Sequence, residues 1–183
     1  MRILFLTHQY FPRSIGGTEM LVRGLVTRLR AHGHEAVVLA YVESPGNQMH
    51  DFGFRVTEFE GAPLWELHYN LSCAENPAEA EFDNPLLAQL VVRAAREIQP
   101  DVVHAAHLMK LSGAVLPRLV REGFPVVVTL SDYWPLCLRH TLLKPDGAIC
   151  ETGPDHPQRC LACAQATHGF AKPSPPCAGE AGL

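Results

Sequence analysis

The sequence predicts an α/β fold in which an open parallel sheet carries helices on both faces and is followed by a Cys-rich irregular loop. Short unbroken apolar runs, typical of strands buried on both faces, alternate with stretches of helical periodicity. Alternation of this kind indicates an open α/β sheet. After Leu130 the periodicity ends and Cys, Pro, Gly and His become frequent, which marks the irregular loop.

The start of the chain is expected to form a β-α-β unit. Residues 3–6 are an apolar run, residues 18–32 repeat Leu and Val at helical spacing, and residues 36–41 are apolar again. Gly33 stands where a glycine commonly follows a helix. A β-α-β unit implies parallel strands joined by a right-handed crossover.

The rest of the chain continues the alternation less evenly. Residues 61–83 carry no clear pattern. Pro100 stops one expected helix, and Pro117 is a candidate kink in another. The further expected elements are a weakly alternating strand at 54–59, a helix at 86–98, a short strand at 102–103, a helix at 108–122 and a buried strand at 125–130.

The length and charge of the chain limit the classes of protein to which it can belong. A chain of 183 residues with 15 Lys and Arg, 19 Asp and Glu and a net charge of −4 is expected to form one domain without a nucleic-acid partner. We expect this domain over residues 1–168, with the Cys-rich loop at 131–168 inside it. Residues 169–183, rich in Pro, Gly, Ala and Ser, are expected to be a disordered tail.

No targeting or membrane segment is expected. The apolar run after Met1 is too short for a signal peptide and meets His8 at once. No stretch approaches the roughly 20 apolar residues of a transmembrane helix. We therefore expect a cytoplasmic protein, whose six Cys are thiols or metal ligands before they are disulfides.

Open α/β sheets bind ligands beyond the carboxyl ends of their strands, so the loops that follow strands are the candidate sites. Gly16, Gly17 and Thr18 open the first helix, where glycines allow close approach to the backbone and helix amides attract phosphate. A diphosphate-binding loop is one interpretation. A tight turn into the helix, with Glu19 at the positive end of the dipole, is the other, and spacing alone favours the turn.

Histidines and aromatic residues near these loops have two interpretations each. His104 and His107 follow the fourth predicted strand and His8 follows the first, so they either contact a polar substrate or are solvated or capped side chains. Trp65 and Tyr69 either stack on a sugar ring or pack. The structural interpretation is favoured in every case.

Ser131 and Asp132 directly follow the last predicted strand. Asp132 is a candidate base or charge stabiliser, and equally a candidate capping residue, which is the default interpretation.

Four cysteines form the most unusual group in the chain: Cys137, Cys150, Cys160 and Cys163. Only the last two have the close spacing of metal ligands. Four thiolates would suit a structural zinc site that orders a loop too polar to fold alone. Free thiols and disulfides remain the alternatives, because the overall spacing is not that of common zinc ribbons.

Several separated motifs together resemble one protein family. They are Gly16-Gly17-Thr18-Glu19 before an amphipathic helix, Pro-Asp-Val-Val-His at 100–104, and Asp-Tyr-Trp at 132–134 after an apolar strand. A Cys-bearing subgroup is matched by Cys137, Leu-Leu-Lys-Pro-Asp-Gly at 142–147, Cys150 and the Cys-x-x-Cys of 160–163. Over about residues 1–165 the chain resembles glycosyltransferase family 4.

The resemblance implies a GT-B fold, in which two Rossmann-like domains enclose the active site. This chain would be the N-terminal domain, which holds the acceptor, and a C-terminal domain with a Glu-x7-Glu motif would hold most of the nucleotide-sugar donor. The implied reaction is sugar transfer with retention of the anomeric configuration. Gly16, Gly17, Thr18 and His104 would then contact the donor, and Ser131 and Asp132 would lie near the transferred sugar.

Two departures from the family pattern matter. The chain of 183 residues carries no donor-binding domain after the first, so we expect it to be inactive unless a separately encoded domain or a longer parent chain completes it. Ser131 stands where the subgroup has His, and a hydroxyl cannot act as a basic imidazole. The alternative hypotheses are a non-enzymatic, truncated or decayed binding module and a small metal-stabilised α/β protein of another function.

Overall fold

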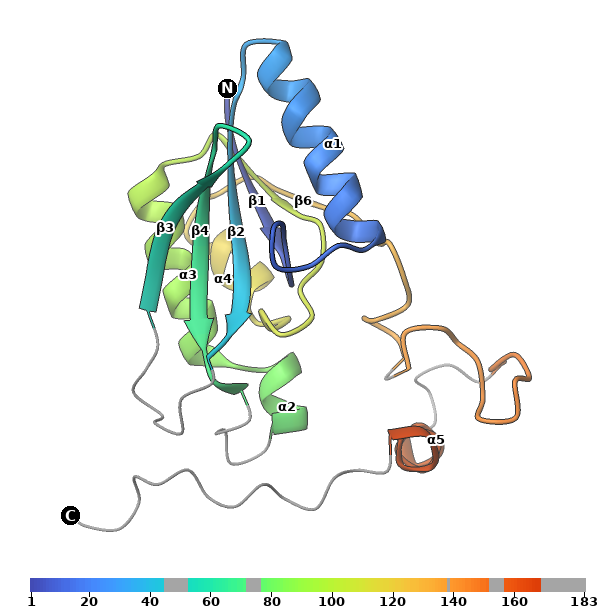
Figure 1. Cartoon of the computed structure of the whole chain (residues 1–183). Coiled ribbons are helices and arrows are strands. Elements are labelled where there is room, and N and C mark those ends of the chain that lie inside the picture. Colours follow the sequence, from blue (N-terminus) through green and yellow to red (C-terminus); the bar gives the residue numbers. More distant parts are fainter. Residues whose placement is uncertain (45–52, 72–76, 138, 152–156, 169–183) are drawn as a thin grey trace, which may run out of the picture. The chain divides into compact units, whose positions relative to one another are not determined.

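The computed structural model describes residues 1–44, 53–71, 77–137, 139–151 and 157–168 (Figure 1). These residues form two compact units, one from Met1 to Thr129 and one that begins at Leu130. No helix in these ranges is long and apolar enough to cross a membrane. The tail predicted at 169–183 lies outside the described residues.

A six-stranded sheet organises the first unit, in the order β3-β4-β2-β1-β5-β6. All neighbours except β3 and β4 pair in parallel, which confirms the predicted open α/β sheet. The β-α-β unit at the start of the chain is confirmed as well, because β1 and β2 are parallel neighbours joined through a helix. The strands are β1 (Arg2–Thr7), β2 (Glu35–Glu43), β3 (Gly53–Phe59), β4 (Ala62–Tyr69), β5 (Val102–Ala105) and β6 (Val126–Val128).

A hairpin makes β3 the exception. β3 pairs antiparallel with β4, so the strand expected at 54–59 exists but the expected parallel direction is wrong for it. Glu60 and Gly61 form the connection with φ of 50° and 75°, the left-handed values that a two-residue hairpin turn of type I′ requires. β4 lies in the stretch without a clear pattern, because its burial does not alternate strictly along the strand.

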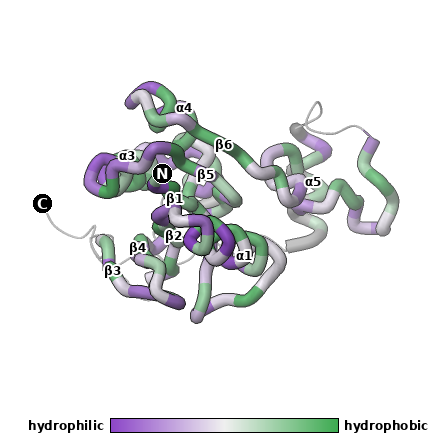
Figure 2. Tube along the Cα trace, turned by 90° about the horizontal axis from the view of Figure 1, so that it is seen from above, coloured by the Kyte–Doolittle hydropathy of each residue, from purple (hydrophilic) through white to green (hydrophobic). Residues whose placement is uncertain are grey.

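Helices cover both faces of the sheet, as predicted (Figure 2). Phe5 packs in a buried cluster with Val22 and Val26 of α1. Leu4 and Leu6 are fully buried and, as neighbours of Phe5 in the strand, point to the opposite face, where α3 and α4 lie. The helices of this unit are α1 (Gly17–Ala31), α2 (Pro77–Phe82), α3 (Pro85–Ile98) and α4 (Val115–Arg121).

Local signals explain where α1 and α3 begin and end. Gly33 has φ of 79° just past α1, which confirms its predicted role after the helix. The Asn84 side chain accepts a hydrogen bond of 3.0 Å from the Leu87 amide and Pro85 occupies the first turn, so α3 starts with a side-chain cap. Gln99 ends α3 in the left-handed conformation, one residue before Pro100.

Two elements differ from the prediction. α4 begins only at Val115 rather than at residue 108, and Pro117 therefore falls in its first turn, where a missing amide costs no helical hydrogen bond. β6 was expected to be buried, but Val127 and Val128 are 51% and 45% exposed. The reason is that β6 is an edge strand, paired only with β5.

The second unit contains a helix that the prediction of an irregular Cys-rich loop omitted. α5 (Pro157–His168) carries Cys160 and Cys163 on consecutive turns. Turns and one isolated bridge between Leu143 and Ile149 make up most of the other described residues of this unit.

Candidate functional site

The loop between β1 and α1 places Gly16 and Gly17 at the start of the helix, beyond the carboxyl end of β1. Gly16 is the residue before the first turn and has an extended backbone. A Cβ atom on Gly16 would lie 2.6 Å from Oε2 of Glu19, so the carboxylate that folds back over Gly16 would have to shift to admit a side chain. A Cβ on Gly17 would meet no atom within 4 Å. Open space therefore adjoins the backbone at Gly17.

Buried polar side chains lie under this loop. Glu19 is 3% exposed, and its Oε1 lies 3.8 Å from His8 Nε2 and 3.4 Å from the Ser14 hydroxyl. Ser14 also donates a hydrogen bond of 2.7 Å to the side-chain oxygen of Gln9. The rings of His8 and His107 are 4.5 Å apart. The structure thus places His8 beside the glutamate of the glycine motif and His107 beside His8.

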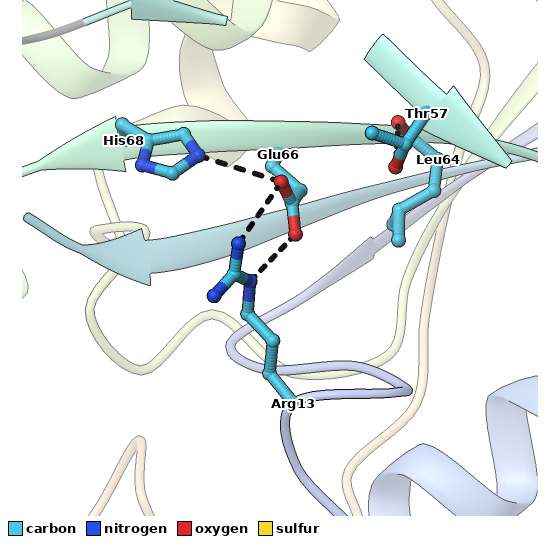
Figure 3. A network of polar contacts seen from close by, with 5 residues as sticks. All are labelled: Arg13, Thr57, Leu64, Glu66 and His68. Atoms are coloured by element: carbon cyan, nitrogen blue, oxygen red, sulfur yellow. Dashed lines mark hydrogen bonds and ion pairs between the residues drawn. The ribbon is translucent and has the colours of Figure 1, made fainter. Parts of the chain in front are cut away.

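A pocket of about 200 Å³ opens beside the same loop. Its polar side includes Arg13 from the loop and Glu66 from β4 (Figure 3). Arg13 Nε donates to Glu66 Oε1 at 2.7 Å, and His68 Nε2 lies 3.5 Å from Oε2. The lining residues are Gln9, Tyr10, Phe11, Arg13, Ser14, Ala40, Tyr41, Val42, Glu43, Leu64 and Glu66.

Electrostatics keep the buried Glu66 charged. Burial by itself would raise the pKa of Glu66, but the hydrogen bond and charge of Arg13, with a further contribution from His68, lower the pKa below its ordinary value. The same hydrogen bond raises the pKa of Arg13. The two side chains therefore form an ion pair that ties the β1–α1 loop to β4.

His104 lies inside β5 and not in the loop after it, so its predicted position is wrong. Its ring contacts Phe5 at 5.1 Å between centroids, and Nε2 is 2.7 Å from the Thr129 hydroxyl. Burial lowers the pKa of His104, which favours the neutral ring at neutral pH. The ring nitrogen that faces β6 is thus engaged within the sheet.

Ser131 and Asp132 belong to the second unit. Ser131 is exposed, and Asp132 Oδ1 accepts a hydrogen bond of 2.8 Å from the Trp134 amide. Asp132 therefore holds a local turn, in line with the capping interpretation but not at the start of a helix. Trp134 is buried beside this turn.

The four cysteines line one pocket of about 500 Å³ in the second unit. Cys137 and Cys150 come from the turns and Cys160 and Cys163 from α5, and all four are half-buried and not disulfide-bonded. Burial, and then the charges that the three other cysteines would carry, raise the pKa of Cys160. The four cysteines line the same pocket, but no three His, Cys, Asp or Glu side chains within the described ranges are arranged to hold a metal ion, so the expected placement within ligand distance of one another stays a prediction.

The sequence did not reveal Arg13 and Glu66 as a pair. They are 53 positions apart, and β4 could not be recognised from its pattern. The one available hint is a glutamate between apolar neighbours, because a buried carboxylate calls for a cationic partner.

Comparison with known proteins finds a matching domain family and similar proteins. The sequence pattern of the glycosyl transferase 4-like domain matches residues 16–167. An uncharacterised 42.6 kDa protein in the cps region of Klebsiella pneumoniae is 24% identical over 88% of this chain. A glycogen synthase of Mycobacterium tuberculosis is 33% identical over 57% of this chain.

One solved structure is also similar. It is described as trehalose-6-phosphate from E. coli bound with UDP-2-fluoro glucose, and it aligns with 70% of this chain and 32% of its own, at 13% identity and a TM-score of 0.43. The chain spans 43% of the Klebsiella protein and 27% of the glycogen synthase.

Proposed function

The chain belongs to the glycosyl transferase 4-like domain family, and from this we propose that it forms the acceptor side of a site for sugar transfer. The donor is a nucleotide-diphosphate sugar, the anomeric configuration is retained, and a second, donor-binding domain completes the site. The observation that supports this most is the family match over 16–167, which includes the glycine motif at the carboxyl edge of the sheet. The proposed location is the cytoplasm, where cysteines stay reduced.

In this proposal Gly16, Gly17 and Thr18 receive the diphosphate of the donor. The first turn of a helix points its amides out along the axis, and the helix dipole favours a negative charge there. The open space beside Gly17 supports backbone approach. His104 would contribute only after releasing Thr129, since Nε2 is 2.7 Å from that hydroxyl.

Binding of UDP and GDP to the purified chain tests this site. Gly17→Val should abolish binding while the far-UV circular dichroism stays unchanged, because the side chain enters the space that the diphosphate would use and meets no protein atom. Gly24→Val is the matched control, since Gly24 lies in the same helix and its Cβ would also meet nothing within 4 Å. Undiminished binding by Gly17→Val would place the diphosphate elsewhere.

Catalysis is proposed only for the completed site. The 183 residues alone should show no sugar transfer, because catalysis requires donor and acceptor to be held together. In a fusion with a donor-binding domain that turns over, Ser131→His should raise the rate by on the order of 10²–10⁴ if an imidazole acts there as acid or base, while Asp132 holds the adjoining turn. An unchanged rate in that fusion would show that Ser131 is neutral.

The second candidate function is a non-enzymatic binding module. The serine at position 131, where the resembling subgroup has histidine, favours it. A fusion that binds donor and acceptor yet transfers no sugar, with Ser131 and with His in its place, would support the binding module over the enzyme.

We propose further that Cys137, Cys150, Cys160 and Cys163 hold a structural zinc ion. Four thiols around one pocket support this, and the pocket would have to close to bring the sulfurs to about 2.3 Å from the ion. Metal analysis of protein purified without chelators should find one zinc per chain. A content well below one would indicate free thiols.

A further inference from the structure

A groove of about 420 Å³ lies between α3 and α4, which pack against each other on one face of the sheet (Figure 2). The residues that line it are Gln89, Val92, Arg93, Arg96, Arg118, Arg121 and Glu122. Four guanidinium charges against one carboxylate leave an excess of three positive charges. This arginine groove is therefore strongly basic, in a chain whose net charge is −4.

The spacing of the residues along both helices explains how the arginines come together. Gln89, Arg93 and Arg96 are four and three positions apart in α3, so they lie on one side of that helix. Arg118 and Arg121 are three positions apart in α4 and likewise share a side. Two rows of side chains, one from each helix, thus border the same space.

Three of the four arginines are available to a ligand. Arg96 is engaged, because its Nε and Nη2 donate to Oε2 of Glu122 at 3.0 and 2.5 Å and so link α3 to α4. Within the described part of the chain, the side chains of Arg93, Arg118 and Arg121 make no hydrogen bond or ion pair. A guanidinium presents its N–H groups as a planar fork that matches the oxygens of a phosphate group.

The helix dipole accounts for only part of this arrangement. Arg96, Arg118 and Arg121 stand in the last turns of their helices, where a positive charge is favourable. Arg93 lies outside the last turn of α3, and the dipole does not explain why it borders the same groove. Each helix end carries only about half a negative charge, so two helix ends do not cancel three guanidinium groups.

The arginine groove is separate from the proposed transfer site. The last turns of α3 and α4 precede β5 and β6, so their arginines lie toward the amino ends of these strands. The glycine motif follows the carboxyl end of β1, which runs parallel to β5. A ligand in the groove therefore leaves the glycine motif open.

We propose that the arginine groove binds a soluble small molecule that carries a phosphate monoester or a diphosphate group. The inference does not rest on the proposed function. A phosphate monoester has a charge of about −1.5 to −2 at pH 7, which three guanidinium groups can neutralise. At about 30 Å³ per water molecule the groove has room for roughly fourteen waters, so the remainder of a small molecule fits beside the phosphate.

The lining favours a soluble ligand over a lipid surface. Val92 is its one apolar residue and is 7% exposed. Adsorption to a membrane gains strength from apolar side chains that enter the lipid layer, and the arginine groove presents none.

NMR titration of the ¹⁵N-labelled 183-residue chain tests the inference. The probes are ribose 5-phosphate and pyrophosphate, with ribose as the uncharged control. Both phosphate probes should shift the Nε–Hε signals of Arg93, Arg118 and Arg121 and the amides of residues 89–96 and 118–122. Ribose should shift none of them. Binding at the glycine motif is followed separately, through the amides of residues 16–20.

One substitution in each helix measures the contribution of the guanidinium groups. Arg93→Gln and Arg118→Gln should each weaken binding of ribose 5-phosphate to the groove by on the order of 10–100-fold, because each removes charge-assisted hydrogen bonds. Arg28→Gln is the matched control, since Arg28 is an exposed arginine in the last turn of α1 and does not line the groove. Dispersed amide signals verify that each variant is folded, and either groove variant suffices if the other does not fold.

Several outcomes would overturn the inference. Phosphate probes that leave the groove signals unchanged would do so, as would an equal loss of affinity in Arg28→Gln and the groove variants. Co-sedimentation with vesicles of phosphatidylglycerol and phosphatidylcholine, without binding of either soluble probe, would replace the small molecule by a membrane. Gly17→Val should leave binding at the groove intact, and its loss there would contradict two separate sites.

Discussion

The two units of this chain are held together in different ways. In the first, buried aliphatic and aromatic side chains fill both faces of the sheet, and Leu4, Phe5 and Leu6 are 0% exposed. In the second, Trp134 is the one large apolar side chain among those described that is buried, while Leu136 and Ile149 are 52% and 71% exposed. The first unit therefore has the core that hydrophobic burial requires, and the second needs other means.

Side-chain hydrogen bonds hold turns in the second unit, and four cysteines line a pocket there. The Asp132 and Asp146 side chains each accept a backbone amide two residues on, at 2.8 and 3.0 Å. The four thiols surround one pocket. We therefore expect the stability of the first unit to depend on the volume of its buried side chains. We expect the stability of the second unit to depend on whether its cysteines bind metal.

The largest expected effect is a deletion of core volume. Leu6→Ala should lower the free energy of unfolding by about 2–5 kcal/mol, because it leaves a cavity in a fully buried position. Leu136→Ala, the same change in the second unit at 52% exposure, should stay within about 0.5 kcal/mol. Urea unfolding followed by circular dichroism measures the loss of stability in both variants. Similar losses would contradict the proposed difference between the two units.

Removal of metal should affect the second unit alone. If zinc links the four cysteines, a strong chelator should broaden or shift amide signals of residues 130–168 and leave those of the sheet unchanged, since binding energy of the ion is folding energy for its site. Cys160→Ser should reproduce the effect, and Cys73→Ser, outside the group of four, should not. Equal changes across the whole chain would contradict a division into independent units.

Side-chain caps should matter more where they are buried. Asn84 is 6% exposed and caps α3, so Asn84→Ala should cost about 1–2 kcal/mol. Asp146→Ala removes a comparable hydrogen bond from an exposed turn and should cost a few tenths of a kcal/mol, because water replaces the carboxylate. Thermal unfolding of the two variants shows which substitution costs more stability. A larger loss for Asp146→Ala would contradict the expectation that buried caps matter more.

The smallest expected effect is a pH dependence from His104. Its folded-state pKa lies below the ordinary value of 6.5, so the unfolded chain takes up the proton more readily. The stabilising contribution is complete above about pH 6.5 and is lost as the pH falls through the lowered folded-state pKa. His104→Gln should therefore lose less stability between pH 7 and pH 5 than the unaltered chain, in thermal melts at both values. Identical losses would exclude His104 as a source of the acid sensitivity.

The sequence by itself determined the helices and strands whose extent is set by residue patterns within them and at their ends. α3 could be predicted because Leu and Val recur at helical spacing and Pro100 ends the pattern, and Gly33 marked the end of α1 because few other residues adopt φ of 79°. The glycine motif and the cysteines were visible for the same reason, since each is a short string of residues with its own chemistry.

Only the tertiary structure decided which distant residues meet. The place of β4 between β2 and β3, the exposure of β6 at the sheet edge and the Arg13–Glu66 pair all depend on strand order. A local pattern carries no information about strand order, because pairing between remote strands is chosen by the burial of the whole sheet. The pocket lined by the β1–α1 loop, β2 and β4 exists for this reason, because these segments are brought together only by the order of the strands in the sheet.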